Sequence, residues 1–271
     1  MKVTIITRKM LHCFLISLAL VLAVSVGITL WVGKDASRKA GASVHKLLPI
    51  YGVNTEEKKI ALTFDCAWEN SDTQVLLDIL GANQISATFF TTGDWCERYP
   101  EDVKAFATAG HDVANHSYGH PHVASISQEK LIADTQKCDD IIEKLTGERP
   151  TLYRAPYGEY SDTMLSVFKQ KLGHQVIQWD VDSRDWQKRE AADMVTDVSQ
   201  KVRPGSILLF HNDTPNTPAA LRQLIPMLKG EGYEFVLVKD LVFTEGYRLD
   251  HEGRQVREET PQTSSSSDAA E

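Results

Sequence analysis

Lys59-Ile60-Ala61-Leu62-Thr63-Phe64 is a short, mostly apolar run that predicts a buried strand. It ends at Asp65 and Cys66, and a helix capped by Ser71 or Asp72 is expected to follow. Outward from this strand, apolar runs and helical segments alternate through about residue 245. This alternation predicts an α/β fold with a parallel sheet, and about seven such units favour a closed or nearly closed barrel. Further strands are expected near residues 84–91, 112–115, 151–153, 175–179, 206–210 and 234–238.

Polar residues follow several of the expected strands. Because the carboxyl ends of parallel strands meet at one edge of a sheet, these residues are predicted to form one site. They are Asp65, His116, His120, Arg154, Asp185 and His211. On a helical turn, His116 and His120 would share a face and could reach one metal ion, although surface or core histidines would show the same spacing.

The composition is that of an ordinary globular chain. With 271 residues, 42% hydrophobic and 24% charged, it can form one sizeable core domain plus extensions. The net charge is -8 and no block of Lys and Arg occurs, so nucleic acid is an unexpected partner. Cys66, Cys96 and Cys138 form no CxxC pair, and buried thiols are expected, with a Cys96–Cys138 bridge as the alternative.

The two ends differ from this core. Leu11 to Val32 holds no Asp, Glu, Lys or Arg and is long enough to cross a bilayer. We therefore expect a cytoplasmic N-terminus at 1–10, a transmembrane signal-anchor at 11–33 and a linker at 34–55, with a cleaved signal peptide as the alternative. The catalytic domain is expected at 56–245, and the polar residues 246–271 are expected to be disordered.

Five motifs in this order resemble the NodB-homology domain of the polysaccharide deacetylases, carbohydrate esterase family 4. They are Thr63-Phe64-Asp65-Cys66, His116-Ser117-Tyr118-Gly119-His120, Arg154-Ala155-Pro156-Tyr157-Gly158, Asp182-Ser183-Arg184-Asp185-Trp186 and Leu209-Phe210-His211. The resemblance covers about residues 56 to 245, and Cys66-Ala67-Trp68 together with the anchor looks most like sporulation deacetylases of the PdaB type. It implies a distorted (β/α)7-type barrel. It also implies removal of N- or O-acetyl groups from glycans, with a divalent metal held by an aspartate and two histidines.

The resemblance assigns the proton-transfer roles. Asp65 matches the catalytic base and Arg154 the residue that orients it, since a guanidinium can hold a carboxylate and keep it ionised. His211 matches the general acid. Asp185 matches the carboxylate that pairs with this histidine, with Asp180 and Asp182 as competitors for that role.

The resemblance also assigns the substrate contacts. The backbone N–H of Tyr157 would stabilise the oxyanion. Trp186 and Leu209 would form an apolar wall around the acetyl methyl group, although both could equally be ordinary core residues.

Cys66 stands where the family has its metal-binding aspartate, while His116 and His120 match the two metal histidines. Three interpretations are open: the thiolate completes a Cys-His-His site, the thiol points into the core, or the site binds no metal. A thiolate ligand would favour zinc.

The predicted function is therefore a membrane-anchored, extracytoplasmic hydrolase that removes N-acetyl groups from cell-wall glycan. Peptidoglycan is the expected substrate, and sporulation is one expected setting. Because of Cys66, a catalytically weak or inactive glycan-binding protein is the first alternative. An O-acetyl esterase acting on a polysaccharide is the second.

Overall fold

The computed structural model of the chain describes residues 47–258. The predicted N-terminal segment, the signal-anchor and residues 34–46 of the linker lie outside this range. Within it, no helix is both long and apolar enough to cross a membrane.

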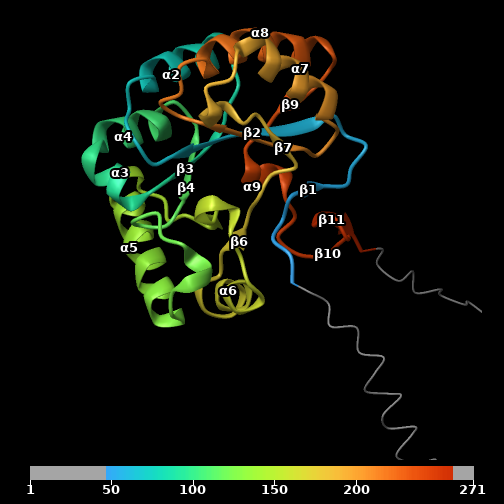
Figure 1. The fold of residues 1–271 in the computed structure, drawn as a ribbon. Coiled ribbons are helices and arrows are strands. Elements are labelled where there is room, and N and C mark those ends of the chain that lie inside the picture. Colours follow the sequence, from blue (N-terminus) through green and yellow to red (C-terminus); the bar gives the residue numbers. More distant parts are fainter. Residues whose placement is uncertain (1–46, 259–271) are drawn as a thin grey trace, which may run out of the picture. The chain divides into compact units, whose positions relative to one another are not determined.

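A curled sheet of parallel strands forms the centre of the fold (Figure 1). Along the sheet the order is β6-β5-β4-β3-β2-β8-β7, and β9 pairs separately with β2. The strands are β2 (Lys59–Cys66), β3 (Thr88–Thr91), β4 (Asp112–Asn115), β5 (Leu152–Tyr153), β6 (Gln175–Val176), β7 (Val181–Asp182), β8 (Ile207–His211) and β9 (Glu234–Phe235). The predicted α/β class and parallel pairing are therefore confirmed.

The sheet curls as the predicted distorted barrel does, but its two edges do not meet. In the described part of the chain the path ends at β6 on one side and at β7 on the other. Both of these strands are only two residues long, so neither can form a ladder that would join the edges. The structure is consequently a curled half-barrel.

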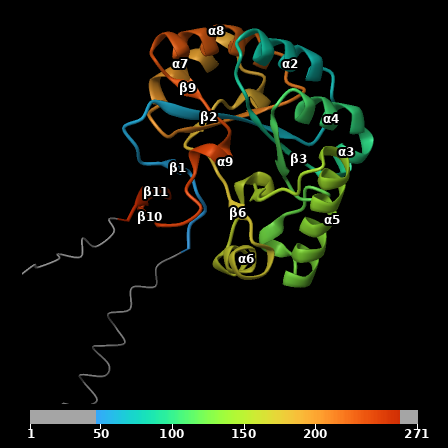
Figure 2. The ribbon, with the colours of Figure 1, turned by 180° about the vertical axis from the view of Figure 1, so that it is seen from behind.

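Helices surround the sheet, as Figures 1 and 2 show from opposite sides. Ser127 accepts a hydrogen bond from the backbone N–H of Lys130 and so caps the longest helix, which ends where Gly147 adopts a left-handed conformation. The helices are α2 (Thr73–Ala82), α3 (Gly93–Arg98), α4 (Pro100–Thr108), α5 (Gln128–Thr146), α6 (Asp162–Val167), α7 (Ala191–Lys201), α8 (Thr217–Gly230) and α9 (Val238–Leu241).

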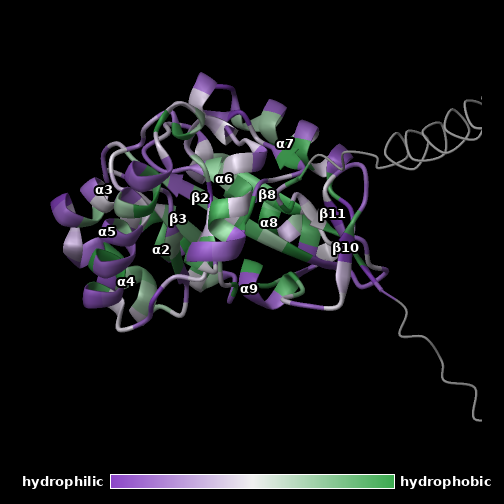
Figure 3. Ribbon diagram, turned by 90° about the horizontal axis from the view of Figure 1, so that it is seen from below, coloured by the Kyte–Doolittle hydropathy of each residue, from purple (hydrophilic) through white to green (hydrophobic). Residues whose placement is uncertain are grey.

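Strand β2 separates the two faces of the sheet. Its alternate residues Ile60, Leu62, Phe64 and Cys66 pack into the main core, which lies between the sheet and helices such as α2 and α8. The residues between them belong to the other face, where Ala61 joins a second core and Asp65 enters the site described below. Figure 3 shows hydrophobic colouring in the middle of the fold around β8 and α8 and hydrophilic colouring on the outer turns of helices such as α4 and α5. Cys66, Cys96 and Cys138 are buried free thiols, so the buried thiols expected for Cys96 and Cys138 are confirmed and the two are not bridged.

The predicted disordered tail is wrong for residues 246–258. These residues carry a hairpin of β10 (Tyr247–Leu249) and β11 (Arg254–Arg257), and β11 also pairs with β1 (Gly52–Val53). The side chain of Arg254 is buried, pairs with Asp180 and donates a hydrogen bond to the carbonyl of Pro204 at 2.7 Å. The polar composition gave no sign of this hairpin, because a buried ion pair and pairing with β1 hold it together with the packing of a single apolar residue, Leu249, against the second core. Residues 259–271 lie outside the described range.

The predicted boundary at residue 56 also falls too late. Ile50 and Val53 are buried in the second core, so residues from 47 onwards belong to the domain and not to a linker.

Candidate active site

The polar residues that follow the strands converge at one end of the sheet. Asp65 is the last but one residue of β2 and His211 is the last residue of β8, and the two are direct neighbours in the parallel register. His116 follows β4, Arg154 follows β5 and Asp185 follows β7. The structure thus brings the predicted proton-transfer residues together.

Asp65 is held by a buried arginine. The Arg154 Nη1 group donates to Asp65 Oδ1 at 2.7 Å and to Thr63 Oγ1 at 2.8 Å. Burial alone would raise the pKa of the Asp65 carboxyl, but the charge and hydrogen bond of Arg154, together with the charge of His211, outweigh it and keep that pKa below its usual range. Asp65 is therefore an ionised carboxylate, as a proton acceptor must be.

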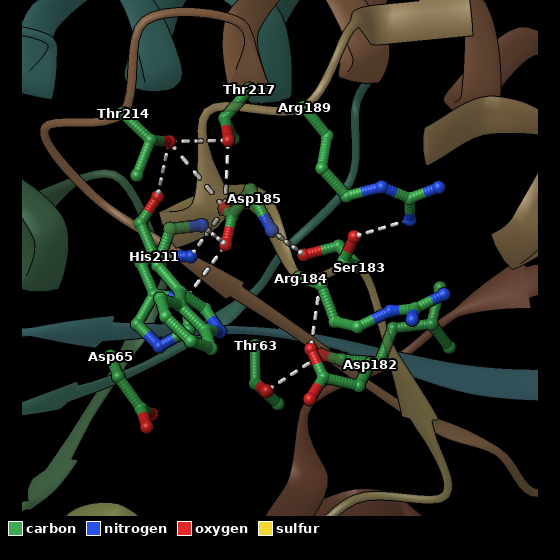
Figure 4. Close-up of polar contacts among 12 residues, drawn as sticks. Thr63, Asp65, Asp182, Ser183, Arg184, Asp185, Arg189, His211, Thr214 and Thr217 are labelled. Carbon is green, nitrogen blue, oxygen red and sulfur yellow. Dashed lines mark hydrogen bonds and ion pairs between the residues drawn. The ribbon is translucent and has the colours of Figure 1, made fainter. Parts of the chain in front are cut away.

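His211 is held by Asp185. Its Nδ1 lies 2.7 Å from Asp185 Oδ1, and its backbone N–H donates to Asp185 Oδ2 at 2.8 Å. Thr217 donates to the same Oδ2 at 2.7 Å (Figure 4). Burial would lower the pKa of His211, yet the hydrogen bond and charge of Asp185 outweigh it and raise that pKa. With Nδ1 on Asp185, Nε2 is the ring nitrogen that can deliver a proton elsewhere.

The two competing aspartates have other partners. Asp180 pairs with Arg254, and Asp182 accepts a hydrogen bond from the backbone N–H of Arg184 at 2.7 Å. Asp185 is thus the carboxylate that pairs with His211.

His116 and His120 lie in a tight loop and not on the expected helical turn. Ser117 and His120 both have positive φ angles, 67° and 54°. His116 Nδ1 donates to the carbonyl oxygen of Arg154 at 2.9 Å, which leaves its Nε2 3.6 Å from Asp65 Oδ2. Burial lowers the pKa of His116, and burial together with His116 lowers the pKa of His120 to about 4. Both rings are therefore neutral near pH 7.

The prediction that Cys66 is a metal ligand is not supported by the structure. Consecutive strand residues point to opposite faces, so Asp65 enters the site while Cys66 packs among the apolar residues beneath the helices. Burial raises the pKa of the Cys66 thiol well above its usual value, as expected for a thiol that faces the core. Across residues 47–258, no group of three or more His, Cys, Asp or Glu side chains is placed to hold a metal ion.

The residues present therefore do not fit the three-ligand metal site that the family resemblance implied. His116 and His120 are the two imidazoles that remain of it, and the predicted zinc stays a prediction.

The predicted substrate contacts divide into exposed and buried residues. Tyr157 and Trp186 are more than half exposed, whereas Leu209 is buried. The Tyr157 ring stacks on His122 at 4.2 Å between centroids and meets the His120 ring edge-on at 4.5 Å. Trp186 is therefore not an ordinary core residue, while Leu209 has the burial of one.

Backbone strain gathers around this site. Six of the seven non-glycine residues with positive φ in the described part of the chain lie in loops that follow site strands. Such conformations cost free energy and persist where the surrounding structure fixes them. The six are Ser117, His120, Tyr157, Arg184, Lys188 and Asp213.

Sequence reasoning missed Asn115 and Asp139, which support the histidine loop. Asn115 Oδ1 accepts from the backbone N–H of Ser117 at 2.7 Å, and its Nδ2 donates to Asp139 Oδ1 at 2.7 Å. It also missed Trp68, whose ring centroid lies 5.9 Å from that of His120 and 6.1 Å from that of His211. An aromatic residue just past a strand-end aspartate was the available signal for Trp68.

Comparison with known proteins identifies the family. Residues 52–177 match the family model described as polysaccharide deacetylase. The chain is 32% identical over 222 residues to the peptidoglycan-N-acetylmuramic acid deacetylase PdaA of Bacillus subtilis, covering 79% of this chain and 83% of that protein. The chain belongs to the polysaccharide deacetylase family. The curated relatives named as peptidoglycan deacetylases are hydrolases acting on carbon–nitrogen bonds, and they confirm the predicted enzyme class.

Other polysaccharide deacetylases show the range within the family. A peptidoglycan-N-acetylglucosamine deacetylase of Bacillus cereus is 33% identical, with 69% of each chain covered. The solved structure of B. subtilis PdaA superposes with a TM-score of 0.67 at 30% identity, covering 71% of this chain and 84% of that one. A family 4 pseudoenzyme of Bacillus anthracis superposes with a TM-score of 0.69 at 30% identity, covering 73% and 69%. The finer likeness to PdaB-type sporulation deacetylases stays a prediction.

Proposed function

We propose that this polysaccharide deacetylase removes N-acetyl groups from the glycan strands of peptidoglycan. One observation carries the proposal: an ionised Asp65 and His211, whose pKa is raised by Asp185, lie side by side on β2 and β8, and each is held by its own buried partner. Amide hydrolysis needs this combination, because a base must activate water and an acid must protonate the leaving amine. The names of the relatives support peptidoglycan as the substrate.

The proposed reaction uses both groups in sequence. Asp65 accepts a proton from water as the oxygen attacks the acetamide carbonyl, and a C–O bond forms. The carbon–nitrogen bond then breaks as His211 Nε2–H protonates the amine. The products are acetate and a free amino sugar. The backbone N–H of Tyr157 is proposed to stabilise the oxyanion, and Arg154 keeps Asp65 charged and oriented.

We further propose that the enzyme is anchored in the cell membrane by residues 11–33, with residues 47–258 outside the cytoplasm. The uncharged run from Leu11 to Val32 supports the anchor, and a substrate in the cell wall requires this location.

Product analysis tests the reaction. Purified peptidoglycan is incubated with the protein, and the released acetate and the sugars are identified by mass spectrometry. We expect sugars that each lose one N-acetyl group. A matched incubation with acetylated xylan, a polysaccharide that carries O-acetyl groups and no N-acetyl groups, should release little acetate. Acetate from xylan alone would replace the proposal with an O-acetyl esterase.

A second function is favoured by a specific observation. Cys66 lies in the core and so leaves only the two histidines of the implied metal site, and the chain resembles a B. anthracis pseudoenzyme. Binding of intact peptidoglycan without any release of acetate would identify the chain as a glycan-binding member of the fold.

A further inference from the structure

Three exposed aromatic side chains mark the mouth of the site. In the part of the chain that the structure describes, only six large hydrophobic side chains are exposed, and the three aromatic ones are Trp68, Tyr157 and Trp186. Each lies in a loop directly after a strand of the site, β2, β5 and β7 respectively. Exposed aromatic side chains that gather in the loops of one site indicate a binding surface.

Trp68 holds the central position among the catalytic rings. Its indole lies within about 6 Å, between centroids, of both His120 and His211, although half of its surface remains open to solvent. The partly exposed indole therefore lies beside the ring that is proposed to protonate the leaving amine.

The loop that carries Trp68 is fixed from below. Arg98 Nη1 donates to the carbonyl oxygen of Trp68 at 2.7 Å, and Arg98 Nη2 donates to that of Ala67 at 3.0 Å. The Trp95 indole N–H donates to the carbonyl oxygen of Glu69 at 3.1 Å. The backbone is thus held by helix α3 while the large side chain is left outside the core. A fixed backbone with a free indole is typical of a pre-organised binding residue, because little conformational entropy is lost when a ligand covers it.

We propose that Trp68 is a substrate-binding residue that stacks on the apolar face of a pyranose ring and so selects a glycan strand over a small acetamide. This inference rests on the proposed deacetylase function and adds a residue that determines its substrate class. A pyranose ring presents C–H groups on its face and hydroxyl groups around its rim. An exposed indole covers the C–H groups of the ring face and leaves the hydroxyl groups of the rim in water.

The test separates binding from catalysis. Trp68→Ala is compared with Trp68→Phe, which keeps an aromatic face, and with Met227→Ala, which removes an exposed apolar side chain on α8 far along the chain from the site motifs. Trp68→Gln serves as a second variant that keeps a soluble, uncharged side chain. Each protein is assayed for cosedimentation with insoluble peptidoglycan, and for KM and kcat on solubilised glycan strands.

We expect Trp68→Ala and Trp68→Gln to weaken peptidoglycan binding and to raise KM by about tenfold, the loss of one aromatic stacking contact. Their kcat should stay within about threefold of the wild type, while Trp68→Phe and Met227→Ala should bind normally. Unchanged cosedimentation and KM in both Trp68 variants would overturn the inference. If no protein releases acetate but the Trp68 variants still bind peptidoglycan less well, the binding role stands and the deacetylase proposal fails.

Discussion

At the scale of single residues, neighbouring side chains on β2 lie on opposite faces of the strand. Asp65 faces Arg154 and His211, whereas the next residue, Cys66, joins Ile60, Leu62 and Phe64 in the core. The sequence contained this answer, because the apolar residues of the strand recur at every second position and Cys66 continues their series. The family motif predicts a metal ligand at position 66, whereas the alternation of apolar residues along β2 predicts a core residue there.

The buried position of Cys66 predicts a small catalytic effect for Cys66→Ala. The substitution should cost about 1 kcal/mol of unfolding free energy, as for other small core truncations, and leave acetate release within about threefold of the wild type. Cys96→Ala, also in a buried free thiol, is the matched control for stability. Urea unfolding and an acetate assay measure both effects. A loss of activity in Cys66→Ala far beyond that in Cys96→Ala would show that the thiol serves the site.

The ion pair of His211 and Asp185 predicts a pH effect. Asp185 raises the pKa of His211, so the imidazolium persists to higher pH than an ordinary histidine would allow. Because the acid must be protonated to act, the alkaline limb of the kcat–pH profile should move to lower pH in Asp185→Asn.

Asp182→Asn is the matched control, since Asp182 raises the pKa of His211 only through its charge and not through a hydrogen bond. Its alkaline limb should move less. Identical profiles for the wild type and Asp185→Asn would contradict the role of His211 as the acid.

At the scale of elements, the segment from His116 to His120 was the least predictable. Its spacing suits a helical turn, but the structure has a loop with left-handed residues at Ser117 and His120. Asn115 fixes this loop through Asp139, which lies 24 residues further along the chain on α5. Local periodicity cannot reveal a support that arises from such a distant contact.

Asn115→Ala should therefore damage both stability and activity. It removes the hydrogen bond to Ser117 N and deprives the buried Asp139 carboxylate of a donor, which should cost about 2–3 kcal/mol. A displaced histidine loop should also lower kcat at temperatures where the variant is still folded.

Two measurements check this expectation: the thermal unfolding midpoint of the variant, and its kcat at a temperature about 20 °C below that midpoint. Asn83→Ala is the control, because the Asn83 side chain donates only to the Ile79 carbonyl at the end of α2. An Asn115→Ala protein with wild-type stability and kcat would show that the loop holds its shape without this support.

At the scale of the whole molecule, the alternation of strands and helices correctly predicted the parallel sheet, and glycines such as Gly147 marked helix ends. The open edge of the sheet and the C-terminal hairpin could not be predicted in the same way. The hairpin depends on Arg254 meeting Asp180, 74 residues away, and a polar segment gives no periodic signal of such a pair.

Removal of this pair should destabilise the whole domain. Arg254→Ala leaves the mostly buried Asp180 with only the more distant Arg203 as a cation and takes a donor from the Val53 and Pro204 carbonyls, at an expected cost of about 3 kcal/mol. Arg257→Ala, on the same strand but exposed, should cost less than about 1 kcal/mol. Urea unfolding compares the two, and equal costs would show that the hairpin does not depend on the buried pair.

The central claim is that Asp65, poised beside His211, is the base of a deacetylation reaction. The most direct test is the release of acetate from peptidoglycan by the wild type and by Asp65→Asn, which keeps the size of the side chain but cannot accept the proton. We predict that Asp65→Asn releases acetate at least about 10²-fold more slowly, the usual contribution of a general base, while it still cosediments with peptidoglycan. Release by Asp65→Asn at the rate of the wild type would contradict the claim.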